Sequence, residues 1–309
     1  MRIVVNSGRA YLPWAATTIR SILDRHDPSA LAFDMLNDET PSEADLGRLE
    51  SMITMAGSSV RFHRVRDPRI DVLPSFGASR VTWFRLMVPH VLADVPRALL
   101  IDADTLVIDD LEPLWTTELG DSLFGAVVNV VEPSRHSHVR SFGLDPRSYL
   151  NAGVLLLDLD ALRREDATGR LLAFAKENAD RVSWFDQDCL NIVFAGRWKH
   201  LHPRWNAMNS LWTWADWAIE VLGSDAVREA TTQPAVLHFE GPSVSKPWHY
   251  LSPHPWRRQY RDTLARTPWG NQTRLEDDTP VVRLISVLPE RLRFPAYWRW
   301  LKVRNRLSR

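Results

Sequence analysis

Short runs of apolar residues alternate with helix-like patterns along the first half of the chain, and this alternation predicts the order of the elements. An apolar run bounded by polar residues is typical of a buried strand, whereas apolar residues spaced three or four apart are typical of a helix. The predicted strands cover residues 3–5, 31–36, 60–65, 98–101, 124–128 and 154–157, and the predicted helices cover residues 13–26, 42–55 and 81–92. Strands that alternate with helices predict an α/β fold, with a mostly parallel sheet and helices on both faces. In such folds, ligands bind at the carboxyl ends of the strands.

The composition fits a globular protein and excludes several classes. The 309 residues include 38 basic and 38 acidic side chains, so the formal net charge is zero. A nucleic-acid partner is therefore not expected, because phosphate binding needs a basic face. The one cysteine, Cys189, excludes an intramolecular disulfide and a cysteine-rich zinc site and fits a reducing compartment. No apolar run is long enough for a transmembrane helix or a signal-peptide core, so we expect a cytoplasmic protein.

The last part of the sequence breaks the charge balance. Residues 281–309 carry eight basic residues against one acid, a net charge of +7, and aromatic residues such as Trp298 and Trp300 lie between the charges. This mixture is typical of a segment that lies on an anionic membrane surface. The alternative is a solvated C-terminal helix that packs on its own domain. We predict one domain over residues 1–270 and a linker with a basic amphipathic tail over residues 271–309, which would place the protein peripherally on the inner face of the membrane.

Two acidic residues follow the predicted strand over residues 98–101. Asp102 and Asp104 are separated by one residue, so they point to the same side if the strand continues. Two carboxylates form half of a site for Mg²⁺ or Mn²⁺, which would bridge to a phosphate-bearing substrate. Alternatively, one carboxylate caps a helix and the other is solvated.

The same acids allow a rival chemistry. With Thr105 they resemble the nucleophile motif of haloacid-dehalogenase-like phosphatases, in which Asp102 would attack phosphorus and Asp104 would act as acid and base. The chain lacks the later Gly-Asp-x-x-x-Asp pair that is usual in that family.

Two further segments place polar residues beside apolar elements. Asn151 and Gly153 precede the predicted strand over residues 154–157. There the amide can donate and accept hydrogen bonds, and the glycine lets the backbone approach closely. A turn before a core strand is the alternative. Asp186 and Gln187 begin an amphipathic helix, where the acid could also serve only as a helix cap.

A histidine ends a later apolar run. His238 is followed by Gly241 and Lys246. An imidazole at the end of a strand suits a third metal ligand, and a lysine in a glycine-containing loop suits a phosphate. A structural histidine is the alternative.

These segments together resemble glycosyltransferase family 8, which includes bacterial lipopolysaccharide galactosyl- and glucosyltransferases and glycogenin. Leu-x-Asp-x-Asp, Asn-Ala-Gly-Val, Asp-Gln-Asp-x-Leu-Asn and His-Phe-x-Gly followed by Lys-Pro-Trp occur in this order, and the resemblance covers roughly residues 1–260. It extends to Thr82-x-x-Arg85 before the acidic pair and to Asp110-Leu111-x-Pro113-Leu114-Trp115 after it. The resemblance implies a GT-A type nucleotide-diphospho-sugar transferase fold with a Rossmann-like sheet. It also implies a retaining hexosyltransferase that moves galactose or glucose from a UDP-sugar to a cell-envelope or exported glycan or glycolipid.

The resemblance further implies roles for individual residues. Asp102, Asp104 and His238 would bind Mn²⁺, or Mg²⁺ in its place. The donor would be held by Asn6, Thr82, Arg85, Asn129, Asn151, Asp186, Gln187, Gly241 and Lys246, with Gln187 and Asp186 acting at the anomeric carbon. Two positions depart from the family pattern. Residues 7–10 lack the acids that usually contact the base and ribose, and Asn129 stands where galactosyltransferases carry a sugar-contacting acid. A protein that kept the fold and lost the chemistry would instead be an inactive glycan-binding protein of the membrane surface.

Overall fold

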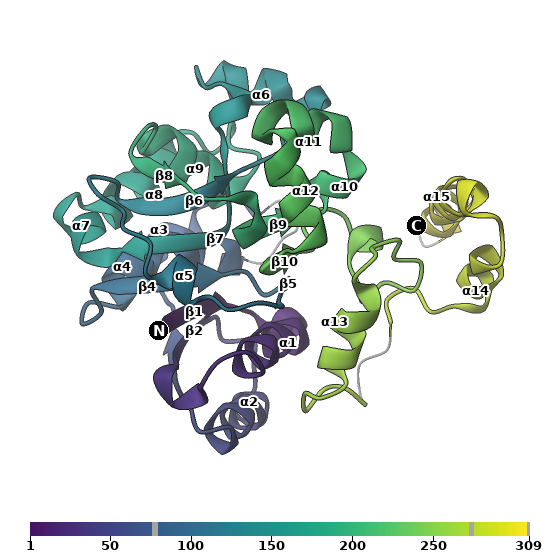
Figure 1. The fold of residues 1–309 in the computed structure, drawn as a ribbon, viewed down its shortest axis with the longest axis horizontal. Helices are drawn as coiled ribbons and strands as arrows, with labels where there is room; N and C mark the ends of the chain where they lie inside the picture. Colours follow the sequence, from purple (N-terminus) through teal and green to yellow (C-terminus); the bar gives the residue numbers. More distant parts are fainter. Residues whose placement is uncertain (76–79, 272–274, 308–309) are drawn as a thin grey trace.

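The structure is a computed structural model that describes residues 1–75, 80–271 and 275–307. Its main sheet has seven strands in the order β3-β2-β1-β4-β7-β6-β8 (Figure 1). These strands are β1 (Arg2–Asn6), β2 (Ala32–Asn37), β3 (Ser59–Arg64), β4 (Arg97–Ile101), β6 (Phe124–Val128), β7 (Leu150–Asp158) and β8 (Trp198–His200). All neighbouring pairs are parallel except those of β7, which runs antiparallel to β4 and β6. The mostly parallel α/β sheet is thus confirmed.

A second, three-stranded sheet lies against the carboxyl end of β4. It consists of β5 (Thr105–Val107), β10 (Val236–His238) and β9 (Ala207–Met208), in that order. β10 runs antiparallel to β5 and parallel to β9. Only Asp102, Ala103 and Asp104 separate β4 from β5, so this acidic turn joins the two sheets.

Helices cover both faces of the main sheet. The α-helices are α1 (Leu12–Leu23), α2 (Glu43–Met55), α3 (Pro68–Asp71), α4 (Val88–Val91), α5 (Glu112–Trp115), α6 (His136–Ser141), α7 (Leu159–Arg164), α8 (Ala167–Glu177), α9 (Phe185–Val193), α10 (Ser210–Thr213), α11 (Ala215–Leu222), α12 (Ser224–Thr232), α13 (Arg257–Leu264), α14 (Pro280–Ser286) and α15 (Glu290–Leu307). Short 3₁₀ helices cover Arg9–Tyr11, Pro28–Ala30, Arg80–Met87, Pro133–Arg135, Pro146–Ser148, Pro203–Asn206 and Ser243–Ser245. Alternate residues of β1 enter different cores, as a strand requires. Ile3 packs with residues of α1 and α2, and Val4 belongs to the core that includes α8 and α9.

The helix predicted over residues 81–92 is divided in two. A 3₁₀ helix, Arg80–Met87, is followed by α4, whose first turn contains Pro89. Proline has no N–H to donate to the carbonyl four residues earlier, so it fits the first turn of a new helix better than a helix interior.

Strand β7 is longer than the sequence predicts. It begins at Leu150, so Asn151 and Gly153 lie within the strand and not before it. The pairing of β6 with β7 shifts between Ala126 and Val127, which is a β-bulge. A bulge redirects side chains locally, and here it does so next to the acidic turn.

The C-terminal helices lie to one side of the sheets. In Figure 1, α14 and α15 form a helical hairpin, residues 280–307, beyond α13. Among the described residues, no helix is both long enough and apolar enough to cross a membrane. The division between residues 1–270 and residues 271–309 stays a prediction.

Candidate functional site

The acidic turn after β4 is held by backbone hydrogen bonds from three elements. The N–H of Asp102 donates to the carbonyl of Gly153 in β7 at 2.8 Å, and the N–H of Phe239 donates to the carbonyl of Asp104 at 2.9 Å. The Thr18 hydroxyl of α1 lies 3.0 Å from the carbonyl of Ala103. Strand β4 therefore ends at Ile101, and a turn, not a continuing strand, brings the two carboxylates together.

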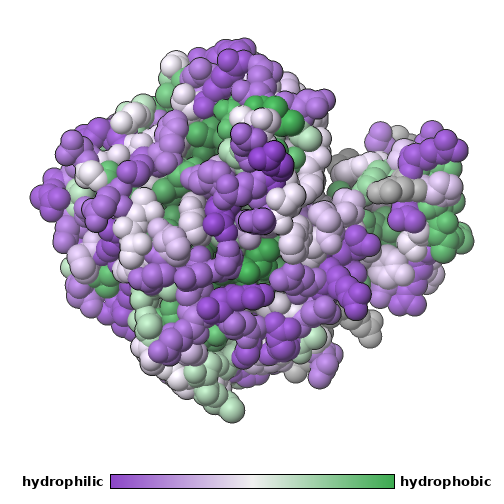
Figure 2. Space-filling model, in the orientation of Figure 1, coloured by the Kyte–Doolittle hydropathy of each residue, from purple (hydrophilic) through white to green (hydrophobic). Residues whose placement is uncertain are grey.

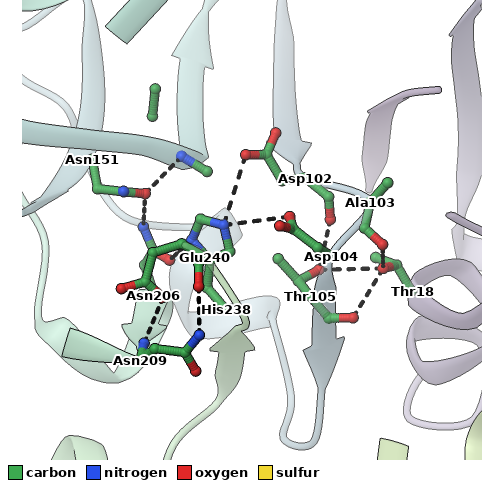
Figure 3. Close-up of polar contacts among 12 residues, drawn as sticks. Thr18, Asp102, Ala103, Asp104, Thr105, Asn151, Asn206, Asn209, His238 and Glu240 are labelled. Carbon is green, nitrogen blue, oxygen red and sulfur yellow. Dashed lines mark hydrogen bonds and ion pairs between the residues drawn. The ribbon is translucent and has the colours of Figure 1, made fainter. Parts of the chain in front are cut away.

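His238 meets both acids from the neighbouring strand β10 (Figure 3). Its Nε2 lies 3.4 Å from an oxygen of Asp104 and 3.8 Å from an oxygen of Asp102. One ligand atom from each of these residues lies within 4.8 Å of the other two, which is close enough for the three to share one ion. Two carboxylates and one imidazole are a donor set that fits Mn²⁺, so the residues predicted as metal ligands do converge.

A network behind His238 fixes the orientation of its ring. His238 Nδ1 lies 2.9 Å from Asn206 Oδ1, and Asn206 Nδ2 donates to Asn151 Oδ1 at 2.8 Å. Because an amide oxygen can only accept, Nδ1 carries a proton, which leaves Nε2, the nitrogen that faces the acids, as the atom that could bind a metal. A Cβ at Gly153 would lie 2.2 Å from His238 Cε1, so only glycine leaves room for this ring.

Two cations are bound to the acids of the turn. Lys246 Nζ donates to Asp104 Oδ2 at 2.5 Å, and the Arg85 guanidinium bridges Asp102 and Asp186. Both cationic side chains are less than a tenth exposed. Buried charges of opposite sign attract one another strongly because little water screens them. The predicted residues Arg85, Asp186 and Lys246 therefore join the predicted metal ligands in a single cluster.

Burial and these ion pairs shift the proton affinities of the cluster in different directions. Burial raises the pKa of Asp102, although Arg85 opposes the shift. The pKa of Asp104 is lowered, because Lys246 and His238 outweigh its burial. Burial raises the pKa of Asp186 to about 6 against the pull of Arg85. Burial by itself lowers the pKa of His238, but Asp104 and Asp102 reverse that effect and leave it raised.

The start of α9 holds Gln187 against the bulged strand. The N–H of Ala152 donates to Gln187 Oε1 at 3.1 Å, and Asn191 Nδ2 donates to the Gln187 carbonyl at 2.9 Å. Phe185 has a φ of +49°, a left-handed conformation that bulky residues seldom adopt and that is common near functional sites.

Asp188 has a structural role beside Gln187. It is fully buried and accepts hydrogen bonds from the Tyr149 hydroxyl at 2.5 Å and from the N–H groups of Ser183 and Trp184. His138 Nε2 lies 3.0 Å from the same carboxylate. With its oxygens engaged in this way, Asp188 ties α6, β7 and α9 together and is not presented to a substrate.

A cavity of about 1020 Å³ opens beside the acidic turn. Its lining comprises Asn6, Ser7, Gly8, Arg9, Ala10, Tyr11, Asp38, Thr40, Val81, Thr82, Arg85, Asp102, Ala103 and Asp104. The predicted donor residues Asn6, Thr82 and Arg85 thus share one cavity. Within the described part of the chain, the side-chain nitrogen and oxygen of Asn6 are buried with no hydrogen-bond partner, as expected of a group that a ligand completes.

Other predicted donor residues lie elsewhere. Asn151 serves the network behind His238, and Gly241 has a φ of +90° that suits glycine in the loop after β10. Asn129 follows β6, and its backbone N–H donates to Tyr149 at 2.7 Å. None of these three residues is part of the cavity lining.

Several site residues are missing from the sequence-based prediction. Tyr11, Asp38 and Thr40 line the cavity, and Asn206 supports His238. Asp38 lies two residues after the predicted strand over residues 31–36, which is a usable signal because ligands gather at the carboxyl ends of strands. Asn206 gives no such local signal.

Comparison with known proteins decides the family. The sequence matches the family model of glycosyl transferase family 8 over residues 2–252. The chain belongs to this family. General stress protein A of Bacillus subtilis (strain 168) is 27% identical over 229 residues, which cover 72% of this chain and 78% of that protein. The lipopolysaccharide 1,3-galactosyltransferase of Salmonella typhimurium (strain LT2) is 24% identical over 269 residues, which cover 84% of this chain and 77% of that protein.

A solved structure confirms the fold. The crystal structure of the galactosyltransferase LgtC with donor and acceptor sugar analogs aligns with a TM-score of 0.78 at 26% identity, covering 88% of this chain and 100% of that chain. The GT-A type fold and the identification as a hexosyltransferase of family 8 are therefore confirmed, and the phosphatase alternative is set aside. Enzymes of this family typically depend on a divalent metal, for which Asp102, Asp104 and His238 form a candidate site. The family also implies a nucleotide-sugar donor and a glycan acceptor.

Proposed function

We propose that this glycosyltransferase moves galactose or glucose from a UDP-sugar to a cell-envelope or exported glycan, with retention of the anomeric configuration and with Mn²⁺ as the metal. The observation that carries the proposal is the convergence of Asp102, Asp104 and His238 beside a cavity that also contains Asn6 and Arg85. Relatives named lipopolysaccharide 1,3-galactosyltransferase and lipopolysaccharide 1,2-glucosyltransferase support the acceptor class.

The nucleoside would bind between the loops after β1 and β2. Residues 7–10 offer no acid, but Asp38 lies next to them, since a Cβ on Gly8 would be 3.2 Å from Asp38 Oδ2. Asp38 Oδ1 accepts the N–H of Thr40 at 3.0 Å, which orients the carboxylate. We infer that Asp38 and the unpartnered amide of Asn6 replace the missing acids as hydrogen-bond partners of the base and ribose.

The diphosphate would bind at the acidic turn. A bound divalent ion supplies the positive charge that stabilises the diphosphate as a leaving group. In the protein alone, Lys246 is paired with Asp104, and Arg85 is paired with Asp102 and Asp186. A metal cation and a diphosphate that enter together leave the net charge of this cluster nearly unchanged. Lys246 would then donate to a phosphate oxygen, and Asp104 would hold the ion together with Asp102 and His238.

The residues beside the anomeric carbon favour a front-face reaction. A double displacement needs a carboxylate nucleophile below the sugar. Arg85 engages Asp186, and Asp188 is buried and engaged by other groups, which leaves the neutral amide of Gln187. We infer that Gln187 stabilises a short-lived oxocarbenium ion and that the departing phosphate oxygen accepts the proton of the acceptor hydroxyl. This route retains the configuration without a side-chain base.

The C-terminal hairpin would bind an anionic membrane surface. Apolar side chains are exposed along it, including Leu284 at 70% and Val287 at 75%. The hairpin carries green apolar surface next to purple polar surface in Figure 2. Arg291, Arg299 and Lys302 are also exposed. Exposed basic and apolar residues on one helical unit are the combination that binds to an anionic bilayer.

A thermal-shift and hydrolysis experiment tests the donor and the metal. UDP-galactose, UDP-glucose, UDP and GDP are each added with and without Mn²⁺, melting temperatures are measured for all four, and UDP release is measured for the two sugar nucleotides. We expect one donor to raise the melting temperature and to be hydrolysed slowly, in both cases only with Mn²⁺, because a ligand of the folded state stabilises it. Stabilisation without hydrolysis would favour the inactive binding protein, and tighter binding of GDP than of UDP would contradict the nucleotide assignment.

A further inference from the structure

The residue proposed to bind the diphosphate lies on a loop that the C-terminal hairpin contacts directly. We call residues 243–251 the Lys246 loop and residues 280–307 the C-terminal hairpin. Val244 and Leu251, near the two ends of the loop, share an apolar cluster with Val282, Ile285 and Tyr297 of the hairpin. All five side chains are at least nine-tenths buried. The hairpin is therefore packed against the loop and is not a detached tail.

A directional chain of polar contacts joins the same two segments. The N–H of Leu251 donates to His249 Nδ1 at 3.0 Å, so Nδ1 is unprotonated and the ring proton is on Nε2. His249 Nε2 lies 3.0 Å from the Tyr297 hydroxyl oxygen, and that hydroxyl donates to Asp277. The pKa of His249 is lowered by burial, which agrees with a neutral ring. His249 is fully buried and Tyr297 is 3% exposed, and Asp277 lies 3.5 Å from His249 Nε2, so the three groups form one polar network.

The segment that leads into the hairpin also pairs with the loop. The N–H of Glu276 donates to the carbonyl of Trp248 at 2.9 Å, and the N–H of Tyr250 donates to the carbonyl of Glu276 at 3.0 Å. The Glu276 carboxylate accepts hydrogen bonds from the Trp248 indole at 2.9 Å and from the Ser243 hydroxyl at 2.5 Å. On its other side, the Trp248 ring stacks on Trp14 of α1 at 4.3 Å. The loop is thus held between the body of the enzyme and the C-terminal segment.

We propose that the C-terminal hairpin positions Lys246 for the donor diphosphate and that Tyr297 is the positioning residue that links the two. Lys246 itself extends from the loop to Asp104, so the loop fixes where its ammonium group lies. Arg261 of α13 also donates to the carbonyls of Pro247 and His249, each at 2.8 Å. Loss of the Tyr297 contacts therefore loosens the loop without releasing it. This proposal rests on the proposed UDP-sugar function.

Calorimetry with UDP and with UMP in the presence of Mn²⁺ tests the proposal. The full-length parent is compared with Tyr297→Phe, which keeps the ring, and with Tyr297→Ala. We expect UDP affinity to fall about three- to tenfold, with the larger loss in Tyr297→Ala, because the loss corresponds to about one hydrogen bond. UMP affinity should fall less, since UMP lacks the second phosphate. Leu284→Ala is the matched control, because Leu284 lies on the same hairpin and is 70% exposed; it should leave both affinities unchanged.

A double-mutant cycle shows whether the effect passes through Lys246. In a Lys246→Met background, Tyr297→Phe should no longer change UDP affinity, because the group that it positions is gone. An unchanged UDP affinity in both Tyr297 variants would overturn the proposal. An equal loss in the Lys246→Met background would also overturn it, because a merely structural effect is additive.

The proposed function and the positioning role can fail separately. If the parent protein binds no UDP with Mn²⁺, the donor assignment is wrong. If the parent binds UDP and the Tyr297 variants bind it equally well, only the positioning role is wrong. Melting temperatures of all variants, measured without ligand, identify any loss of UDP affinity that comes from unfolding. If Tyr297→Ala unfolds, the affinity of Tyr297→Phe, which keeps the ring, decides whether the positioning role holds. Deletion of residues 281–309 is not a clean test of membrane binding, because it removes these contacts as well.

Discussion

The acidic turn and the C-terminal hairpin both concentrate charge, but they hold it in opposite ways. At the turn, each charge is paired and lies wholly or partly out of solvent, as where Arg85 bridges Asp102 and Asp186. On the hairpin, basic side chains such as Arg299 and Lys302 lie in solvent. Buried charges interact strongly and are little affected by salt, whereas exposed charges contribute small, additive and salt-sensitive amounts. A single substitution at the turn should therefore abolish nearly all activity. Each substitution on the hairpin should weaken binding by a small step.

The largest effect is expected at the metal ligands. Asp102→Asn and Asp104→Asn should each lower hexose transfer by at least about 10³-fold, because each removes a charged ligand from the ion that stabilises the leaving group. A chelator should have the same effect on the parent, and added Mn²⁺ should reverse it. Melting temperatures separate lost chemistry from lost folding. Full activity in chelator without added metal would contradict the metal assignment.

Gln187 should give the next largest effect. Gln187→Ala should lower turnover by about 10²-fold, the loss seen when one polar group that stabilises a transition state is removed. Donor affinity should hardly change, because the substitution removes no charge. NMR of the product linkage from an α-linked donor should show retention, and intact-protein mass spectrometry of Gln187→Glu should show no adduct during normal turnover. A β-linked product would contradict retention, and an adduct on Asp186 would indicate double displacement.

Asp186 should make stability depend on pH. Its pKa in the folded protein is about 6, above the ordinary 3.8, because it is buried. The folded state then binds the proton more tightly than the unfolded state, so this stabilisation is complete below pH 4 and is lost as the pH rises through 6. The change is on the order of 2–3 kcal/mol. Unfolding of the metal-free parent and of Asp186→Asn, measured from pH 4 to 7, should show their stability difference moving in favour of the variant as the pH rises. If the unfolding free energies of the parent and of Asp186→Asn change in parallel with pH, the pKa of Asp186 is not raised by folding.

The sequence predicts the chemistry of the turn better than its geometry. An apolar strand followed by paired acids is a local pattern, so residues 102 and 104 can be predicted as metal ligands without a fold. Their convergence depends on a turn into a second sheet, which the alternation of strand residues does not reveal. The sequence predicts that Asn151 contacts the donor, and this stays a prediction; its hydrogen bond to Asn206, which supports His238, depends on the fold and has no local signal.

Residues that act through distant contacts could not be found in this way. The contact between Tyr297 and His249 joins positions 48 residues apart, and neither residue lies in a recognisable motif. The basic tail has a strong compositional signal, but composition does not show that one face of the hairpin packs on the Lys246 loop. The sequence predicts the acidic turn and the basic tail as two independent regions. Only the structure shows that the C-terminal hairpin packs on the loop that carries Lys246.

Membrane binding by the hairpin should respond in graded steps. Replacing Arg291, Arg299 and Lys302 by serine should weaken binding to vesicles of anionic lipid about tenfold to a hundredfold, since each basic residue near the surface contributes ~1 kcal/mol before crowding losses. The loss should be smaller at high salt, where the parent also binds weakly. UDP affinity should not change, because these side chains are exposed. Vesicle flotation measures the first effect and calorimetry the second. Undiminished vesicle binding by the triple variant would show that the tail does not attach the protein to the membrane.

The smallest effect is expected at Asp38, which lines the donor cavity beside Gly8. Asp38→Asn keeps the size of the side chain and one oxygen for the N–H of Thr40, but it replaces a charged acceptor by a neutral amide. Hydrogen bonds to a charged group are worth more than neutral ones, so UDP affinity should fall about fivefold. Affinity for inorganic pyrophosphate with Mn²⁺ should stay the same, because Asp38 contacts the nucleoside and not the phosphates in this assignment. Thr40→Val keeps the shape but removes the hydroxyl that accepts the N–H of Arg9 at 2.8 Å and donates to Asp38 Oδ1 at 2.5 Å, so it shows how much UDP affinity is lost when these loop contacts are lost and the Asp38 carboxylate remains. If Asp38→Asn lowers the affinities for pyrophosphate and for UDP equally, Asp38 acts through the long-range charge of the site. If the substitution lowers neither affinity, other groups hold the base and ribose, and Asp38 does not replace the acids that residues 7–10 lack.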